Sequence, residues 1–110
     1  MGEQETKKLL LNKGWKFVTQ NYRTRFGEID LIFIDNKTLV FVEAKTRSNL
    51  EWGTPEESIS RSKLAKLRKA AEIFLCEHPV YSDWLYRIDV AAVEKKDDKL
   101  DIRLYENVYF

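Results

Sequence analysis

The chain has 110 residues, of which 44% are hydrophobic and 34% charged, and its formal net charge is +1. This length predicts one domain over residues 1–110, with a core large enough to fold without a disulfide or a structural metal. The composition excludes disordered and fibrous proteins, and no apolar run approaches the ~20 residues of a membrane helix. Because Cys76 and His78 are the only residues of their kinds, a Cys/His zinc site is excluded and a reducing cytoplasmic location is expected.

The first half of the chain is predicted to contain one helix and three strands. Residues 3–13 carry leucines on one side of a helix, which stops at Gly14. Residues 15–22 are expected to form a strand, followed by a polar turn over residues 23–27. Residues 28–35 and 38–46 then predict a β-hairpin. Both faces of these two strands are apolar over most of their length, so they are expected to be central strands covered on both sides.

The second half is predicted to hold a helix and two strands. Thr54 as N-cap, Pro55 at the first position and Glu57 three residues after the cap mark the start of a helix reaching about residue 77. A strand over 85–94, a turn over 95–99 and a last strand from 100 to about 109 follow. The order αβββαββ indicates an α/β or α+β fold in which helices flank a mixed sheet.

Three residues with chemically versatile groups are given structural roles. His78 is expected to contribute to the C-terminal cap of the second helix. Cys76 is expected to be a small buried hydrophobe. Asp89, which interrupts an apolar strand, is expected to pair with a basic side chain near Arg87.

The hairpin places unusual charges opposite each other. With the turn at residues 36–37, its register opposes Asp30 to Glu43 and Glu28 to Lys45, all on one face. Opposed like charges destabilise a sheet, and burial raises the cost. Lys45 could compensate by pairing with the acids, and a divalent cation held by carboxylate oxygens would do so better.

Two carboxylates, a cation and a lysine can together cleave a phosphodiester. The cation polarises the phosphate and lowers the pKa of a bound water. Lys45, two residues after Glu43 on the same face, can stabilise the developing charge or position that water. The alternative is structural: acids and lysines at strand ends are commonly solvated or paired with each other.

Two sequence strings resemble a known family. NYRTRFGEIDLI at residues 21–32 and VFVEAKTR at residues 40–47 are similar to the bacterial YraN-like family of endonuclease-like proteins. That family belongs to the PD-(D/E)xK superfamily, with restriction endonucleases and archaeal Holliday-junction resolvases. The similarity covers nearly the whole chain. It implies a restriction endonuclease-like three-layer α/β fold, Mg²⁺ or Mn²⁺ as cofactor, and DNA as the substrate class.

The resemblance also implies roles for individual residues. Asp30, Glu43 and Lys45 match the acidic, acidic and basic positions of the catalytic core, with the two acids as metal ligands. Glu3 matches an acidic residue that related resolvases carry on the first helix near the metal, and the alternative is a charged residue at a frayed helix end. Three further residues are expected to assist as auxiliary groups: Glu28, Arg47 and Lys63. For Lys63 the alternative is a surface lysine whose stem covers the core.

The leading hypothesis is a metal-dependent endonuclease-like domain acting on DNA, including branched or flapped DNA. The alternative is a non-catalytic nucleic-acid-binding or recruitment module on the same fold. Residues 61–69 contain five basic residues and no acid, so they form either a solvated helix face or a contact for phosphates. The residues expected at a nucleic-acid interface are Arg61, Lys66, Arg68 and Lys69, with Trp52 either stacking on a base or packing on the core. A homodimer is expected, with the C-terminal strand as a candidate exposed edge.

Overall fold

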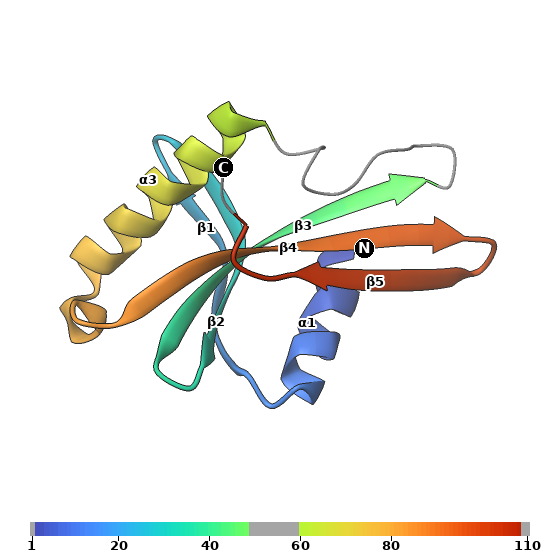
Figure 1. The fold of residues 1–110 in the computed structure, drawn as a ribbon, viewed down its shortest axis with the longest axis horizontal. Coiled ribbons are helices and arrows are strands. Elements are labelled where there is room, and N and C mark those ends of the chain that lie inside the picture. Colours follow the sequence, from blue (N-terminus) through green and yellow to red (C-terminus); the bar gives the residue numbers. More distant parts are fainter. Residues whose placement is uncertain (1, 49–59, 109–110) are drawn as a thin grey trace.

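A five-stranded mixed sheet lies between two helices (Figure 1). The computed structural model describes residues 2–48 and 60–108. Its elements in chain order are α1 (Gly2–Asn12), β1 (Lys16–Thr24), β2 (Gly27–Asp35), β3 (Thr38–Ser48), α3 (Arg61–Glu77), the short 3₁₀ helix η1 (Pro79–Tyr81), β4 (Leu85–Lys96) and β5 (Lys99–Tyr105). Leaving aside η1, the predicted order αβββαββ and the α/β class are confirmed.

The strands are ordered β1-β2-β3-β4-β5, so the hairpin strands β2 and β3 are interior, as predicted. Neighbouring strands are antiparallel except β3 and β4, which are parallel along eleven register pairs. Parallel neighbours need a crossover connection, and α3 lies within the connection between β3 and β4. The sheet is therefore mixed because a helix, and not a hairpin, joins its third and fourth strands.

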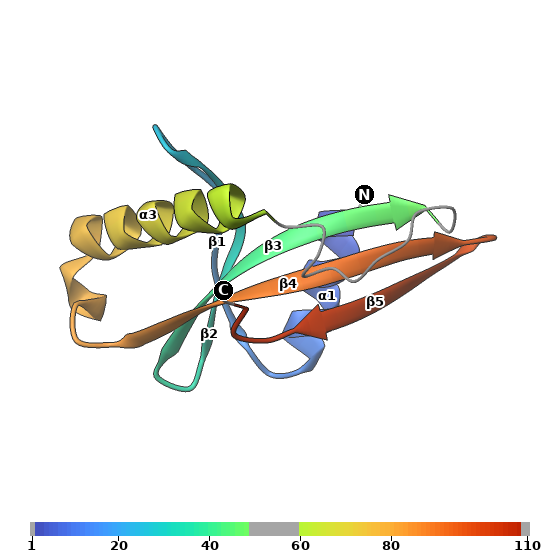
Figure 2. The same cartoon turned by 45° about the horizontal axis from the view of Figure 1, so that its top comes forward.

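Each helix covers its own face of the sheet (Figure 2). On the α3 side, Phe41 and Ile32 pack against Phe74 and other buried residues of α3. On the α1 side, Leu10 and Trp15 pack with alternate residues of β2, β3 and β4. Because both faces are covered, the interior strands are apolar on both sides. Within residues 2–48 and 60–108, no helix is long and apolar enough to cross a membrane.

The predicted hairpin register is confirmed from Leu31–Val42 to Asp35–Thr38. Asn36 occupies the turn with φ 57°. Asparagine tolerates this left-handed conformation better than most residues, which is why a turn without glycine forms here.

Several element boundaries differ from the prediction. β1 continues to Thr24 and β2 begins at Gly27, so the turn predicted over residues 23–27 is shorter because its ends pair as strand. α3 begins at Arg61, where Ser60 is the N-cap and accepts a hydrogen bond from the Lys63 amide; Thr54, Pro55 and Glu57 lie outside the described residues. β4 continues to Lys96, so its turn into β5 is shorter than expected. β5 ends at Tyr105 because the chain then turns back, and the Val108 amide donates to the Ile88 carbonyl at 2.7 Å.

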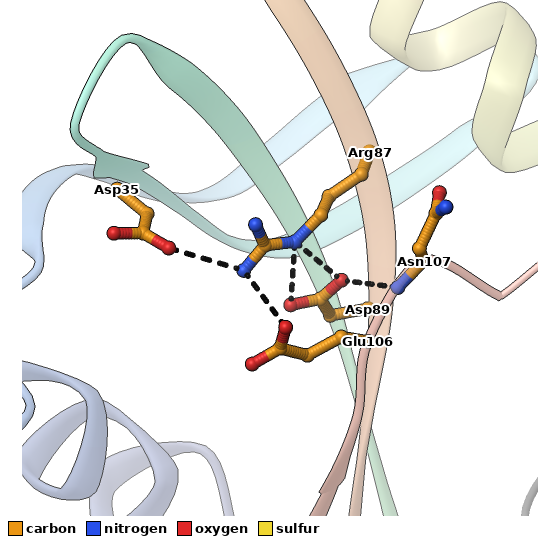
Figure 3. Close-up of polar contacts among 5 residues, drawn as sticks. All are labelled: Asp35, Arg87, Asp89, Glu106 and Asn107. Carbon is orange, nitrogen blue, oxygen red and sulfur yellow. Dashed lines mark hydrogen bonds and ion pairs between the residues drawn. The ribbon is translucent and has the colours of Figure 1, made fainter.

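A network of ion pairs and hydrogen bonds around the buried Asp89 holds this C-terminal segment (Figure 3). Asp89 is fully buried, and its carboxylate accepts from Arg87 Nε at 3.0 and 3.2 Å and from the Asn107 amide at 2.8 Å. Arg87 Nη2 also lies 3.5 Å from Asp35 and 3.8 Å from Glu106. The predicted structural pairing of Asp89 is thus confirmed, and it ties β4 to the β2–β3 turn and to the chain after β5.

The helix-end predictions have mixed outcomes. His78 is the C-cap of α3, and its Nδ1 lies 2.8 Å from the Phe74 carbonyl oxygen, as expected. The prediction for Cys76 is wrong, because this residue is exposed. It follows the buried Phe74 by two residues, which is about 200° around a helix, so it points away from the sheet.

Candidate carboxylate site

The sheet splits at Asp30. Strand pairing between β2 and β3 stops at Leu31–Val42 among the described residues. Ile29 packs on the α3 side and Leu31 on the α1 side, so the regular alternation of side chains is broken between them. The predicted direct pairs Asp30–Glu43 and Glu28–Lys45 are therefore not formed, because the two strands diverge before reaching them.

The side chain of Asp30 bridges the gap left by this divergence. Its Oδ2 accepts a hydrogen bond from the Ala44 amide at 2.9 Å. A backbone donor that would otherwise bond to a neighbouring strand is thus satisfied by a carboxylate. On the opposite side of β2, Asn21 of β1 has φ 53°, which marks a second irregularity beside Asp30.

Glu43 lies beside Asp30 even though their strands are not paired. Its side chain is only 8% exposed. Burial and, secondly, the nearby charge of Asp30 raise the pKa of Glu43 to about 7. Lys63 Nζ lies 3.4 Å from Glu43 Oε2 and opposes this rise. The repulsion predicted between the two acids is present, and a lysine from α3 offsets part of it.

Glu3 joins the pair from the other face of the sheet. Burial and the charge of Asp30 raise the pKa of Glu3, and hydrogen bonding to Asp30 adds to the effect. The start of α1 is held close to the sheet: Gly2 and Thr6 are buried, and the Thr6 hydroxyl donates to the Gly2 carbonyl at 2.8 Å. A Cβ on Gly2 would lie 2.6 Å from Thr46 Oγ1 of β3. Glycine at this position therefore allows the close approach that carries Glu3 to Asp30.

The carboxyl groups of Glu3, Asp30 and Glu43, with Lys63, are called the carboxylate cluster below. Among the described residues, no group of three or more Asp, Glu, His or Cys side chains is close enough together to hold a metal ion as it stands. The donor set is nevertheless all carboxylate oxygen, which suits Mg²⁺ or Mn²⁺. Its acids repel each other, and one lysine offsets them only in part. These residues fit a hard divalent cation in chemistry and in charge.

The other predicted residues lie at varying distances from the cluster. Lys45 lies on β3 two residues beyond Glu43, is half-buried, and forms no ion pair with an acid of the described chain. Glu28 forms an ion pair with Arg23 at 3.5 Å, and not with Lys45. The side chain of Arg47 and the whole of Trp52 lie outside the part that the structure describes.

The basic residues of α3 do not share one face. Lys66 and Lys69 point toward the β1–β2 turn, where Lys69 Nζ lies 4.9 Å from the centre of the Phe26 ring. Arg68 lies near Tyr86 of β4. Burial and the charge of Glu72 raise the pKa of Tyr86, and the positive charge of Arg68 opposes this rise. Arg61 is exposed at the first residue of the helix.

Sequence reasoning missed two residues of the β1–β2 turn, Arg25 and Phe26. Arg25 Cζ lies 5.0 Å from the centre of the Phe26 ring, which is also in contact with Lys69. The signal was present in the sequence, because an arginine and an aromatic residue precede the turn glycine Gly27, whose φ is 150°.

Comparisons with known proteins agree with the motifs. The family model described as "Uncharacterised protein family UPF0102" matches residues 2–93. A UPF0102 protein from Alkaliphilus oremlandii is 41% identical over 110 residues, which cover 99% of this chain and 94% of the relative. A UPF0102 protein from Carboxydothermus hydrogenoformans is 37% identical, over 96% of this chain and 89% of the relative. A third, from Natranaerobius thermophilus, is 47% identical, over 76% of this chain and 71% of the relative. The chain therefore belongs to the UPF0102 family, and the resemblance to YraN-like proteins is confirmed.

Proposed function

We propose that this protein is a metal-dependent endonuclease-like enzyme that hydrolyses phosphodiester bonds in DNA, including branched or flapped DNA. The observation that supports this function best is the approach of two acids, Glu3 of α1 and Glu43 of β3, to Asp30 of β2 at the split in the sheet. Mutually repelling carboxyl groups are costly to keep together, and perturbed acids of this kind gather where a protein binds cations or moves protons.

Asp30 and Glu43 would hold Mg²⁺ or Mn²⁺, with Glu3 as a third ligand. Such a cation, when bound, polarises a phosphate oxygen and lowers the pKa of a coordinated water. Asp30 is well suited to hold one, because its hydrogen bond to the Ala44 amide restrains its carboxylate. Glu43 must lose its proton to become a ligand, and with a pKa near 7 it does so around neutral pH.

The lysines would manage charge during hydrolysis. Lys45 projects from the strand that carries Glu43, with no competing ion pair in the described chain. Its ammonium group can stabilise the negative charge that develops on the phosphate oxygens, or position the attacking water. Lys63 offsets part of the charge of Glu43 in the absence of a cation.

The test combines metal binding with DNA cleavage. Mg²⁺ and Mn²⁺ are titrated by calorimetry into the wild type and into Asp30→Asn and Glu43→Gln, with Glu72→Gln as a control on the exposed side of α3. Metal binding is expected to vanish in the first two variants and to persist in the control. The same proteins are then assayed on linear, flapped and branched DNA. Cleavage that survives in Asp30→Asn would refute the assignment.

A second candidate is a non-catalytic nucleic-acid-binding module. The observation that favours it is the ion pair between Glu43 and Lys63, which offsets one acid without any cation. This module predicts DNA binding that is unchanged by Mg²⁺ and by both acid-to-amide substitutions. The endonuclease predicts that metal binding, cleavage or both depend on the two acids.

A further inference from the structure

The β1–β2 turn carries an aromatic ring that separates two hollows against α3. The first, called the inner pocket, has a volume of about 190 Å³ and is lined by Phe26, Gly27, Glu28, Lys63, Lys66 and Leu67. The second, called the outer groove, has a volume of about 380 Å³ and lies between Phe26 and the outer side of α3, from Lys69 to Glu77. Phe26 is the wall common to both, so its ring forms a ridge between them.

The inner pocket adjoins the carboxylate cluster. Lys63, which lines the pocket, also lies 3.4 Å from Glu43. Glu28, on the pocket wall, is close enough to Glu3 for its charge to act on that carboxyl group. A group seated in the inner pocket would therefore lie next to the acids that are proposed to hold the cation.

Positive charge lies beside the ridge, while Glu28 stands on the wall of the inner pocket and Glu72 and Glu77 line the outer groove. Arg25 Cζ and Lys69 Nζ lie 5.0 and 4.9 Å from the centre of the Phe26 ring. Lys66 is exposed at the inner pocket, and it lies on the same side of α3 as Lys69 because the two are three residues apart. An aromatic ring with cations beside it is the combination that binds single-stranded nucleic acid, in which bases stack on rings and phosphates meet the cations.

The size of the inner pocket favours an unpaired strand. Its volume is well below the ~300 Å³ at which pockets begin to hold drug-sized ligands, so it takes one phosphate or one base and not a base pair. Stacking of a base is stronger than an exposed cation–π contact. A base can therefore displace one cation from the Phe26 ring, and that cation stays beside the strand as a partner for a phosphate.

We propose that Phe26, the inner pocket and the neighbouring Arg25, Lys66 and Lys69 bind an unpaired segment of DNA, such as a flap or strand end, and lead it to the carboxylate cluster. This inference rests on the proposed function for its choice of DNA. It assigns a substrate-binding surface to the β1–β2 turn and to one side of α3, and it leaves Arg68, on the β4 side of the helix, outside that surface.

The experiment measures binding without cleavage. Fluorescein-labelled oligothymidylate is titrated by fluorescence anisotropy with no divalent metal present, using the full chain. Phe26→Ala is expected to weaken binding by about 5- to 150-fold, the range found when one stacked base is lost. Phe26→Trp is expected to bind as tightly as the wild type or more tightly, because it keeps a ring for stacking.

Charge is tested with a matched pair of double variants. Lys66→Gln with Lys69→Gln removes two positive charges beside the ridge, and Lys95→Gln with Lys99→Gln removes two exposed ones near the β4–β5 turn. Log affinity falls as log salt rises, and the Lys66/Lys69 variant is expected to reduce the steepness of this fall by about 1.4, at ~0.7 for each phosphate contact to a single strand. The Lys95/Lys99 variant is expected to leave the steepness unchanged.

Unchanged binding by Phe26→Ala, or loss of binding by Phe26→Trp, would overturn the inference. An equal effect of the two double variants would also overturn it. Duplex DNA and oligouridylate are titrated in the same way, and tighter binding of the duplex than of the single strand would overturn it too. Tighter binding of oligouridylate would overturn DNA as the source of the strand. Failure here is distinguishable from failure of the proposed function. If anisotropy refutes the binding surface, the calorimetry and cleavage assays of Asp30→Asn and Glu43→Gln still test the metal-dependent function. If those assays refute the function, the anisotropy result on single-stranded DNA is unaffected.

Discussion

Glu43→Gln is expected to make the protein more stable above neutral pH while removing one ligand of the proposed metal site. The Glu43 carboxyl is 8% exposed, and burial and Asp30 raise its pKa from 4.5 to about 7. The folded protein therefore holds this proton more tightly than the unfolded chain. The stability due to this proton is fully present below pH 4.5 and is lost as the pH rises to about 7.

The magnitude follows from the two pKa values. The difference between 4.5 and about 7 corresponds to about 3 kcal/mol, at ~1.4 kcal/mol for each pH unit. Glutamine carries no charge to bury, so most of this cost disappears in the variant. The favourable contact with Lys63 already lowers the Glu43 pKa, so its loss in the variant is contained in this difference and is not subtracted again. The net gain above pH 8 is about 3 kcal/mol.

Thermal unfolding of both proteins at about pH 5 and about pH 8.5 measures this gain. An unfolding entropy of ~2.1 cal/mol/K per residue over 110 residues converts about 3 kcal/mol into a rise in Tm of about 13 °C at the higher pH. Near pH 5 the two proteins are expected to differ little. Glu72→Gln, an exposed change, is the control and should follow the wild type at both values. A Glu43→Gln variant that is less stable than the wild type at pH 8.5 would refute the origin of the Glu43 pKa given above.

Three further predictions concern the surroundings of the cluster and the ion-pair network of Asp89. Gly2→Val places a side chain against Thr46, because even a Cβ at this position would lie 2.6 Å from Thr46 Oγ1. We expect α1 to shift and to move Glu3, which should lower the Tm and weaken metal binding in calorimetry. Gln4→Ala, at an exposed position of the same helix, should change neither quantity. Lys63→Gln removes the ammonium group that competes for Glu43, so Mn²⁺ should bind more tightly at a pH well above 7, and weaker binding there would contradict this competition. Asp89→Ala leaves Arg87 without its buried partner, which is expected to cost about 3–5 kcal/mol in urea unfolding and to speed amide exchange at Asn107. Asp101→Asn breaks only an exposed pair with Arg103 and should cost less than about 1 kcal/mol.

Local sequence patterns predicted most of the architecture. The hairpin of β2 and β3 follows from two apolar runs and a polar turn, and its register was correct wherever the strands pair. These features depend on residues close together in the chain, so a single segment contains the information for them. The error at the end of β5 arises where a distant contact intervenes, because Asp89 binds the Asn107 amide and the chain leaves the sheet early.

The candidate site divides in the same way. Its acids could be named from the sequence, because Asp30 and Glu43 lie on neighbouring strands at positions that the hairpin opposes. Their actual arrangement could not, since the strands diverge before reaching them and Asp30 bonds to the Ala44 amide instead. Sequence spacing alone carries no sign of such a split, because it arises from packing on both faces of the sheet.

What the sequence determined by itself is the set of chemical groups and the order of the elements that carry them: an αβββαββ chain with paired acids, a lysine and a basic helix. Only the tertiary structure decided which groups meet. It carries Glu3 to Asp30 across a close helix–sheet contact at Gly2, brings Lys63 to Glu43, and sets Lys69 over Phe26. Each of these contacts joins residues from separate elements, and their positions are set by the burial of apolar surface between helix and sheet, which local spacing does not encode.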